Sequence, residues 1–167
     1  DRPNRVTGIR VKDKGMADES YVQAICLIGK LRNLEQLDLD ASWRQKSKAN
    51  WETLRDLDCL QSLSINHGLN DGDMPRFPAW PALKELSIRV FDVSDQGIAE
   101  LAKLPRLEVL NLRAVKSGTC RGLQALQKSN SLRSLRIAGS RLSEDDLAAI
   151  GHLQSLEELT LDGPTQR

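Results

Sequence analysis

A short aliphatic pattern recurs seven times along the chain and constrains the fold more than any other feature. In each copy, a Leu, Ile or Val is followed three and five positions later by another such residue. The copies are VTGIRV (6–11), LEQLDL (34–39), LQSLSI (60–65), LKELSI (83–88), LEVLNL (107–112), LRSLRI (132–137) and LEELTL (156–161). Their first residues lie 28, 26, 23, 24, 25 and 24 positions apart. Repeats of this length are typical of solenoids, whose units pack only against their neighbours.

Each repeat is predicted to contain a strand, a turn and a short helix. The alternation at the end of each motif indicates a strand with one face toward the core. Upstream of most motifs, apolar residues fall three, six and nine positions before the first aliphatic residue, which places them along one side of a helix. These stripes include Leu31, Ile28 and Ile25 in the first repeat, Leu104, Leu101 and Ile98 in the middle, and Leu153, Ile150 and Leu147 near the end. Ser129 interrupts the stripe before Leu132.

One repeat departs from this plan between residues 74 and 82, where the sequence reads MPRFPAWPA. Three prolines there exclude a normal helix, so we expect an extended segment instead. Phe77 and Trp80 should fill the core beside Trp51. Elsewhere, helix starts are signalled by Ser94 and by Ser143 with Asp146, which resembles a capping box.

These observations predict an α/β fold: a right-handed solenoid with a seven-stranded parallel sheet. Helices are wider than the roughly 4.8 Å spacing of strands, so the stack must curve. The sheet should lie on the concave face, and the short helices or extended segments on the convex face. We expect residues 1–167 to form one such domain, with repeats starting near 6, 34, 60, 83, 107, 132 and 156, within a longer chain.

Two stretches narrow the resemblance to known proteins. VSDQGIAELAKLPRLEVLNL (93–112) and LSEDDLAAIGHLQSLEELTL (142–161) are similar to a V-T-D-x-G-L repeat. With the seven motifs, they make the chain resemble leucine-rich repeat proteins, in particular bacterial ones and the ribonuclease-inhibitor-like class. The resemblance implies a horseshoe segment that binds proteins through its concave face. The usual turn asparagine is absent, since its positions hold Lys14, Ser42, Gly68, Phe91, Val115, Ser140 and Pro164. We therefore expect the turns to depend on Ser42, Ser140, backbone pairing, or packing of Phe91 and Val115.

Composition and motifs argue against several other classes of function. The net charge is only +1 and aromatic residues make up 4%, which disfavours nucleic acid as a partner. No apolar run approaches the roughly 18 residues of a membrane span. His67 with Asp71 and Asp73 could hold a metal or act as a base, but Asn70–Asp71–Gly72 reads more simply as a turn. No catalytic or nucleotide-binding motif occurs. We expect no enzymatic activity, metal or cofactor.

The three cysteines indicate a weak preference for a reducing compartment. Cys26, Cys59 and Cys120 are odd in number and widely spaced, and they form no C-x-x-C pair. We interpret them as small buried or half-buried side chains. The compartment itself stays undetermined.

Stacked strands align equivalent positions, so the exposed residues of the sheet can be predicted in columns. Arg10 and Lys12 should lie beside Asp38 and Asp40, and their charges should cancel. Farther along, the expected surface combines a basic group with its neighbours: Arg89, Arg113 and Arg136 with Glu85, Ser87, Val109 and Asn111. Two interpretations remain open. The arginines, with fewer internal partners, either receive carboxylates from an acidic stripe on a partner or are merely solvated.

The favoured function is a module that binds a protein or peptide through the concave face, with no role for nucleic acid or membrane. The alternative is a substrate-receptor or targeting segment of a larger multidomain enzyme or signalling protein. A passive structural spacer is a third possibility. The last motif ends at Leu161, with no helical stripe after it. Because both end strands look bare, end-to-end self-association is also predicted.

Overall fold

One parallel sheet runs through the whole computed structural model, which describes residues 6–12, 18–40, 51–113, 120–139 and 142–163. Its seven strands lie in sequence order, each beside the next. They are β1 (Gly8–Lys12), β2 (Gln36–Asp40), β3 (Ser62–Asn70), β4 (Glu85–Asp92), β5 (Val109–Arg113), β6 (Ser134–Ala138) and β7 (Glu158–Asp162). The predicted strands and their parallel order are confirmed.

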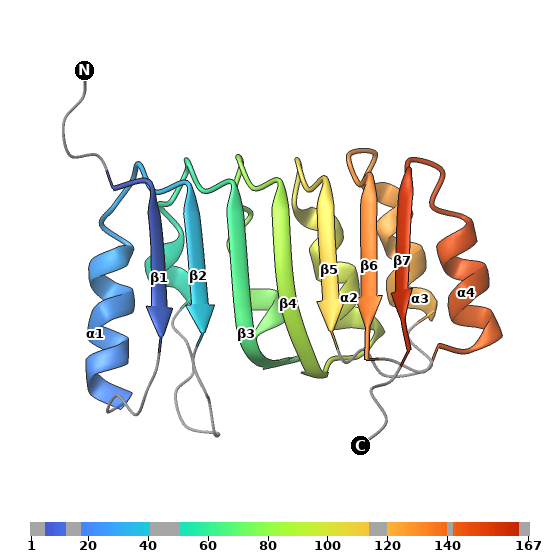
Figure 1. Cartoon of the computed structure of the whole chain (residues 1–167), viewed down its shortest axis with the longest axis horizontal. Coiled ribbons are helices and arrows are strands. Elements are labelled where there is room, and N and C mark those ends of the chain that lie inside the picture. The colour runs from blue at the N-terminus through green and yellow to red at the C-terminus, as the bar shows by residue number, and fades with distance from the viewer. Residues whose placement is uncertain (1–5, 13–17, 41–50, 114–119, 140–141, 164–167) are drawn as a thin grey trace.

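The connections form a second layer behind the sheet (Figure 1). It contains α1 (Asp18–Ile28), α2 (Asp95–Glu100), α3 (Cys120–Ala125) and α4 (Glu144–Gly151), with short 3-10 turns η1 (Trp51–Leu54), η2 (Met74–Arg76), η3 (Leu101–Lys103) and η4 (Leu126–Lys128). In Figure 1, α1 lies outside β1 and α4 lies outside β7, so the helical layer is longer than the sheet. Because helices need more room than strands, the sheet takes the inner side of the curve, as predicted.

The core is a column of aliphatic side chains between the two layers. The inward residues of β2 to β6 are at most 2% exposed: Leu37, Leu39, Leu63, Ile65, Leu86, Ile88, Leu110, Leu112, Leu135 and Ile137. In β7 the equivalent residues Leu159 and Leu161 are 44% and 43% exposed. Burial of this column therefore depends on having a neighbour on both sides, and the last repeat lacks one in the part of the chain described.

The proline-rich segment supplies aromatic packing in place of a helix. Only the 3-10 turn η2 forms there, and Phe77 then takes up an extended conformation. Trp51 and Trp80 are almost fully buried, and the Phe77 ring meets Trp51 edge-on with ring centroids 4.8 Å apart. The Trp80 indole Nε1 donates to the Leu54 carbonyl at 2.9 Å. The predicted packing role of these three aromatic residues is confirmed.

Both predicted helix caps are present. The Ser143 hydroxyl accepts from the backbone N–H of Asp146, whose carboxylate in turn accepts from the backbone N–H of Ser143. This is the reciprocal pattern of a capping box. At the start of α2, the Ser94 hydroxyl accepts from the N–H of Gln96 at 3.2 Å.

Aspartates, rather than the expected residues, tie the turns after two of the strands to the next repeat. Asp71 Oδ1 accepts from the N–H of Ser94 at 2.8 Å, and Asp95 Oδ1 accepts from the N–H of Gly122 at 2.7 Å. Each bond is ionic in character and links one coil to the following one. Of the residues predicted to stabilise turns, Ser42, Val115 and Ser140 lie outside the described residues, as does the side chain of Phe91.

The end repeats correct three sequence predictions. Leu31 and Leu147, assigned to buried stripes, are 38% and 45% exposed. Cys26, predicted to be buried or half-buried, is exposed on α1, whereas Cys59 is half-buried as expected. The side chain of Cys120 is outside the described set. In a solenoid, an end repeat is covered on one side only, which explains these exposures.

Candidate functional site

The open face of the sheet carries the outward side chains of all seven strands, and we call it the sheet face. One predicted column is confirmed along its whole length by the strand register: Arg10, Asp38, Ser64, Ser87, Asn111, Arg136 and Thr160. These residues are exposed or half-buried. The sequence therefore located this column on the sheet face correctly.

A bulge in β3 changes the neighbouring column. Ile65 lies opposite Ile88, but Gly68, not Asn66, lies opposite Arg89. The expectation that Asn66 aligns with Arg89 was wrong, because the bulge adds residues 66 and 67 to one strand of the pair. The Asn66 amide instead lies between two charged groups. Its Nδ2 donates to Asp38 Oδ1 at 3.4 Å, and its Oδ1 accepts from the Arg113 guanidinium.

Charges near the two ends of the sheet face are paired within the chain. Arg10 Nε lies 2.6 Å from Asp38 Oδ2, as the sequence predicted. Lys12 and Asp40 are opposite each other in register, yet the described residues show no ion pair between them. At the far end, Arg136 donates twice to Asp162 Oδ2, at 2.9 and 2.6 Å. The assignment of Arg136 to a group with few internal partners was therefore wrong.

The middle of the sheet face is different, because two arginines lie directly opposite each other. Arg89 on β4 pairs in register with Arg113 on β5, and both side chains are exposed. Neither makes an ion pair with any residue that the structure describes. Arg113 keeps its bond to Asn66, and Arg89 makes no hydrogen bond within the same set. Like charges in this position repel each other.

The remaining predicted residues surround this arginine pair. Glu85 and Val109 are opposite each other at the start of β4 and β5, and Ser87 and Asn111 are opposite each other in the centre. Glu85 accepts a hydrogen bond from the Ser62 hydroxyl at 3.3 Å. Ser87 and Asn111 are half-buried, so they form a polar floor beside Arg89 and Arg113. The structure thus places all seven predicted residues on one face.

The edge of the sheet face where the strands begin is internally paired, as expected for a solvated charge ladder. Lys84 Nζ lies 3.3 Å from Glu108, and Arg133 Nε lies 3.4 Å from Glu157. These exposed pairs each contribute little to stability, about 0–1 kcal/mol. Because their charges are already matched, this rim is a poor place for an acidic or basic partner to bind.

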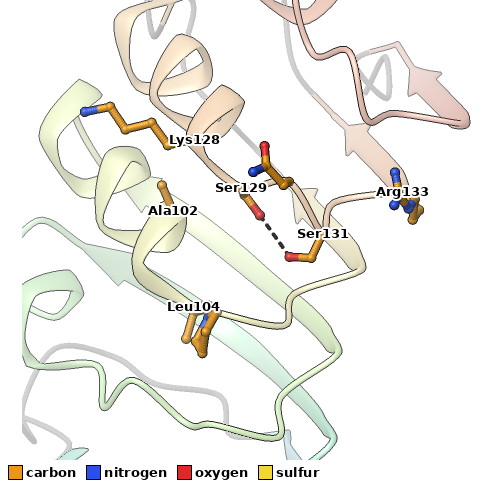
Figure 2. Close-up of a pocket in the computed structure, with 8 residues that line it drawn as sticks. Ala102, Leu104, Lys128, Ser129, Ser131 and Arg133 are labelled. Carbon is orange, nitrogen blue, oxygen red and sulfur yellow. Dashed lines mark hydrogen bonds between the residues drawn. The ribbon is translucent and has the colours of Figure 1, made fainter.

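A shallow hollow of about 460 Å³ lies away from the sheet face, where the chain passes from the helical layer back to the sheet. Figure 2 shows Ala102, Leu104, Lys128 and Arg133 around it, with the Ser129 and Ser131 hydroxyls 3.2 Å apart. Ser129 occupies the position that Leu104 fills in the preceding repeat, and its smaller side chain leaves the space. Arg133 donates to the Ser155 carbonyl at 3.0 Å. The hollow brings together no acid, base and nucleophile.

The described residues show no other chemical centre. The predicted turn at 70–73 is present, with Gly72 N–H donating to Asn70 Oδ1 at 2.8 Å and Asn70 N–H donating to Asp73 Oδ2 at 3.1 Å. Within the ranges described, no group of three or more His, Cys, Asp or Glu is arranged to hold a metal. The helices found in those ranges are all too short or too polar to cross a bilayer.

The comparisons with known proteins identify the fold. Neither the protein-family models nor the curated proteins give a match. Among solved structures, internalin C2 from Listeria monocytogenes superimposes with a TM-score of 0.57 over 81% of this chain at 24% sequence identity. The present chain spans 55% of that internalin chain. Internalin C2 is a leucine-rich repeat protein, and the likeness confirms the leucine-rich repeat fold that the motifs predicted.

Proposed function

We propose that the chain is a protein-interaction module that binds an acidic segment of a partner protein on the sheet face, at Arg89 and Arg113. The observation that carries the proposal is the arrangement of these two arginines. They are directly opposite in register, exposed, and without a carboxylate partner in the described part of the chain. Leucine-rich repeat folds of this kind offer an extended surface rather than an enclosed catalytic pocket, which favours binding over catalysis.

Electrostatics favour a carboxylate-bearing partner at this position. Two guanidinium groups on adjacent strands repel each other, so an anion placed between them gains two attractions and relieves one repulsion. Guanidinium groups bind carboxylates through two parallel hydrogen bonds, which also fixes orientation. Elsewhere on the sheet face, Arg10 and Arg136 already hold internal carboxylates, so they have less to gain.

The neighbours of the arginine pair limit the chemistry of the partner. Glu85 carries negative charge on the same face, and Asp38 and Asp162 bracket the pair along the sheet. A uniformly anionic backbone, such as that of nucleic acid, would meet these carboxylates. A peptide with a few separated acidic side chains would not, and its amide groups could bond with Ser87 and Asn111.

The proposal is tested by charge reversal with a matched control. Proteins retained by the immobilised chain are identified and purified, and their binding to the chain is measured by calorimetry. We expect the double variant Arg89→Glu/Arg113→Glu to raise the dissociation constant at least about tenfold, or about 1.4 kcal/mol. The control Arg106→Glu/Arg121→Glu makes the same change in net charge at exposed sites outside the sheet face. Equal affinity of wild type and the first variant would rule out the arginine pair as the binding centre.

The alternative, a substrate-receptor or targeting segment of a larger enzyme or signalling protein, uses the same surface. It differs in what happens to the bound partner. The two are separated by the reading frame that encodes the chain, because an adjoining catalytic or assembly domain would favour the alternative.

A further inference from the structure

Exposed apolar side chains are confined to the two ends of the solenoid. Within the described ranges, the large aliphatic residues classed as exposed all lie in the first repeat or in the last two elements: Val6, Val22, Leu27, Leu31, Leu147, Leu159 and Leu161. Between residues 34 and 146, the described part of the chain has none. The apolar surface that a neighbour would cover is therefore located at a first-repeat face, which we call the head, and a β7–α4 face, which we call the tail.

The backbone at the head and the tail is complementary in the same way as at every internal junction. At each of six junctions, one carbonyl accepts from two successive N–H groups of the next repeat. At the first, the Thr7 carbonyl accepts from Glu35 and Gln36 at 2.8 Å, and at the last, the Arg133 carbonyl accepts from Glu157 and Glu158. In the structure as described, the ladder stops at the Glu157 carbonyl. Its missing donors have their counterparts at the head, in the N–H groups of Thr7 and Gly8.

We propose that a second copy of this chain binds head to tail, with β1 of one copy pairing in parallel with β7 of another. Extending the observed register by one strand places Leu159 beside Ile9, Leu161 beside Val11 and Asp162 beside Lys12. The Glu157 carbonyl then accepts from the N–H groups of Thr7 and Gly8. The junction repeats the geometry of the six internal ones, so both edge strands gain a partner without a change in fold.

Charge favours this polarity over a symmetric one. The head presents Arg10 and Lys12, whereas the tail presents Glu158 and Asp162, and all four side chains are exposed. In the head-to-tail arrangement Lys12 faces Asp162, and Arg10 lies diagonally near both acidic residues. Two tails paired antiparallel would set Glu158 against Asp162, and two heads would set Arg10 against Arg10. Like charges directly opposite destabilise a strand pair, so both symmetric pairings are disfavoured.

The helical layer is compatible with the same junction. α1 and α4 are the outermost helices at the head and the tail (Figure 1). Val22 and Leu27 on α1 and Leu147 on α4 are 42%, 62% and 45% exposed. Within the described residues no helix follows β7, so α1 of the second copy can close against α4 and cover Leu159 and Leu161. The apolar residues of both ends then become core.

Joining unlike surfaces has a definite consequence for assembly. A head-to-tail contact leaves one free head and one free tail after each addition, so it builds open chains or closed rings, never only dimers. The contact is remote from Arg89 and Arg113. It therefore holds or fails independently of the proposed partner binding.

Two end-blocked variants test the proposal. At the head, Gly8→Pro removes an N–H group that the ladder assigns to the free edge, and a Cβ there would lie 3.6 Å from the Gln36 side chain, an ordinary contact. At the tail, Leu161→Lys places a charge on the exposed apolar face. Masses are measured by sedimentation as a function of concentration. Gln124→Lys, on the exposed surface of α3, is the control for the added charge.

The expected result for wild type and for the control is a mass that rises with concentration beyond the dimer. Each end-blocked variant should be monomeric under the same conditions, with a dissociation constant raised at least about tenfold. An equimolar mixture of the two variants should give dimers only, because each supplies the end that the other lacks. Circular dichroism confirms that each variant is folded. If Leu161→Lys is not, Asp162→Lys and Lys12→Asp replace the pair; each should associate more weakly alone, and their mixture should recover association.

Three results would overturn the proposal. A wild-type chain that stays monomeric at the highest attainable concentration has no head-to-tail contact. A dimer that survives in one end-blocked variant indicates a symmetric contact through the other end. A mixture of folded variants that remains monomeric shows that the two ends do not recognise each other.

Discussion

Truncating the same leucine column in the middle and at the end of the sheet gives a direct measure of how stacking stabilises this chain. Leu110 on β5 and Leu159 on β7 occupy equivalent positions in the register, through Leu135 on β6. Leu110 is fully buried, whereas Leu159 is 44% exposed. The pair therefore differs in burial and not in side-chain type or strand position.

The expected costs follow from that difference. Complete burial of a leucine side chain contributes about 1.5–3 kcal/mol, and a cavity left in a closed core adds to the loss. Leu110→Ala should therefore lower the free energy of unfolding by about 2–5 kcal/mol. Leu159→Ala loses roughly half of the burial contribution and leaves no closed cavity, so we expect about 1 kcal/mol.

Urea denaturation followed by circular dichroism measures both costs, at a concentration low enough to keep the chain monomeric. Hydrogen exchange adds the spatial information. After Leu110→Ala, the faster-exchanging amides should lie in β4, β5 and β6 and leave β1 unchanged, since repeats are coupled to their neighbours only. Equal destabilisation by the two substitutions, or exchange that rises uniformly, would refute the reasoning.

Other substitutions test single contacts. Trp80→Phe keeps the aromatic packing but leaves the buried Leu54 carbonyl without its indole donor, so unfolding in urea should show a loss of about 1–3 kcal/mol. Ser143→Ala removes the capping hydroxyl of α4 and should cost about 1 kcal/mol, seen as a lower thermal midpoint. Gly122→Ala should destabilise the chain, because the new Cβ would lie 2.7 Å from a backbone oxygen of the preceding repeat. Gly151→Ala meets nothing within 4 Å and should be neutral or stabilising by up to about 1 kcal/mol; if both glycine variants behave alike in thermal unfolding, the close approach of the repeats is wrong.

The inter-repeat aspartates explain how the solenoid manages without turn asparagines. Asp71 and Asp95 each accept a backbone N–H from the following repeat, at 2.8 and 2.7 Å. A carboxylate in this role makes a shorter and stronger hydrogen bond than an amide would. The sequence contained these residues, but the usual leucine-rich pattern directs attention to a different position. For that reason the ladder was predicted from serines and apolar packing instead.

The sequence by itself determined the period, the inward column and the outward column of this protein. Those features depend on spacing: residues two apart on a strand share a face, and equivalent residues of successive coils must stack. The aromatic packing of Trp51, Phe77 and Trp80 was also predictable, because three prolines exclude a helix and leave a space that large side chains must fill.

Only the tertiary structure decided which charges meet. The bulge in β3 moved Asn66 out of its predicted column and toward Arg113, and a regular repeat pattern carries no signal for such an insertion. Arg136 reached Asp162 diagonally, through a long side chain whose direction spacing does not define. The exposure of Leu147 likewise depended on whether another repeat covers it. Repeat spacing fixes the backbone path, whereas side-chain partners depend on the three-dimensional distances between coils.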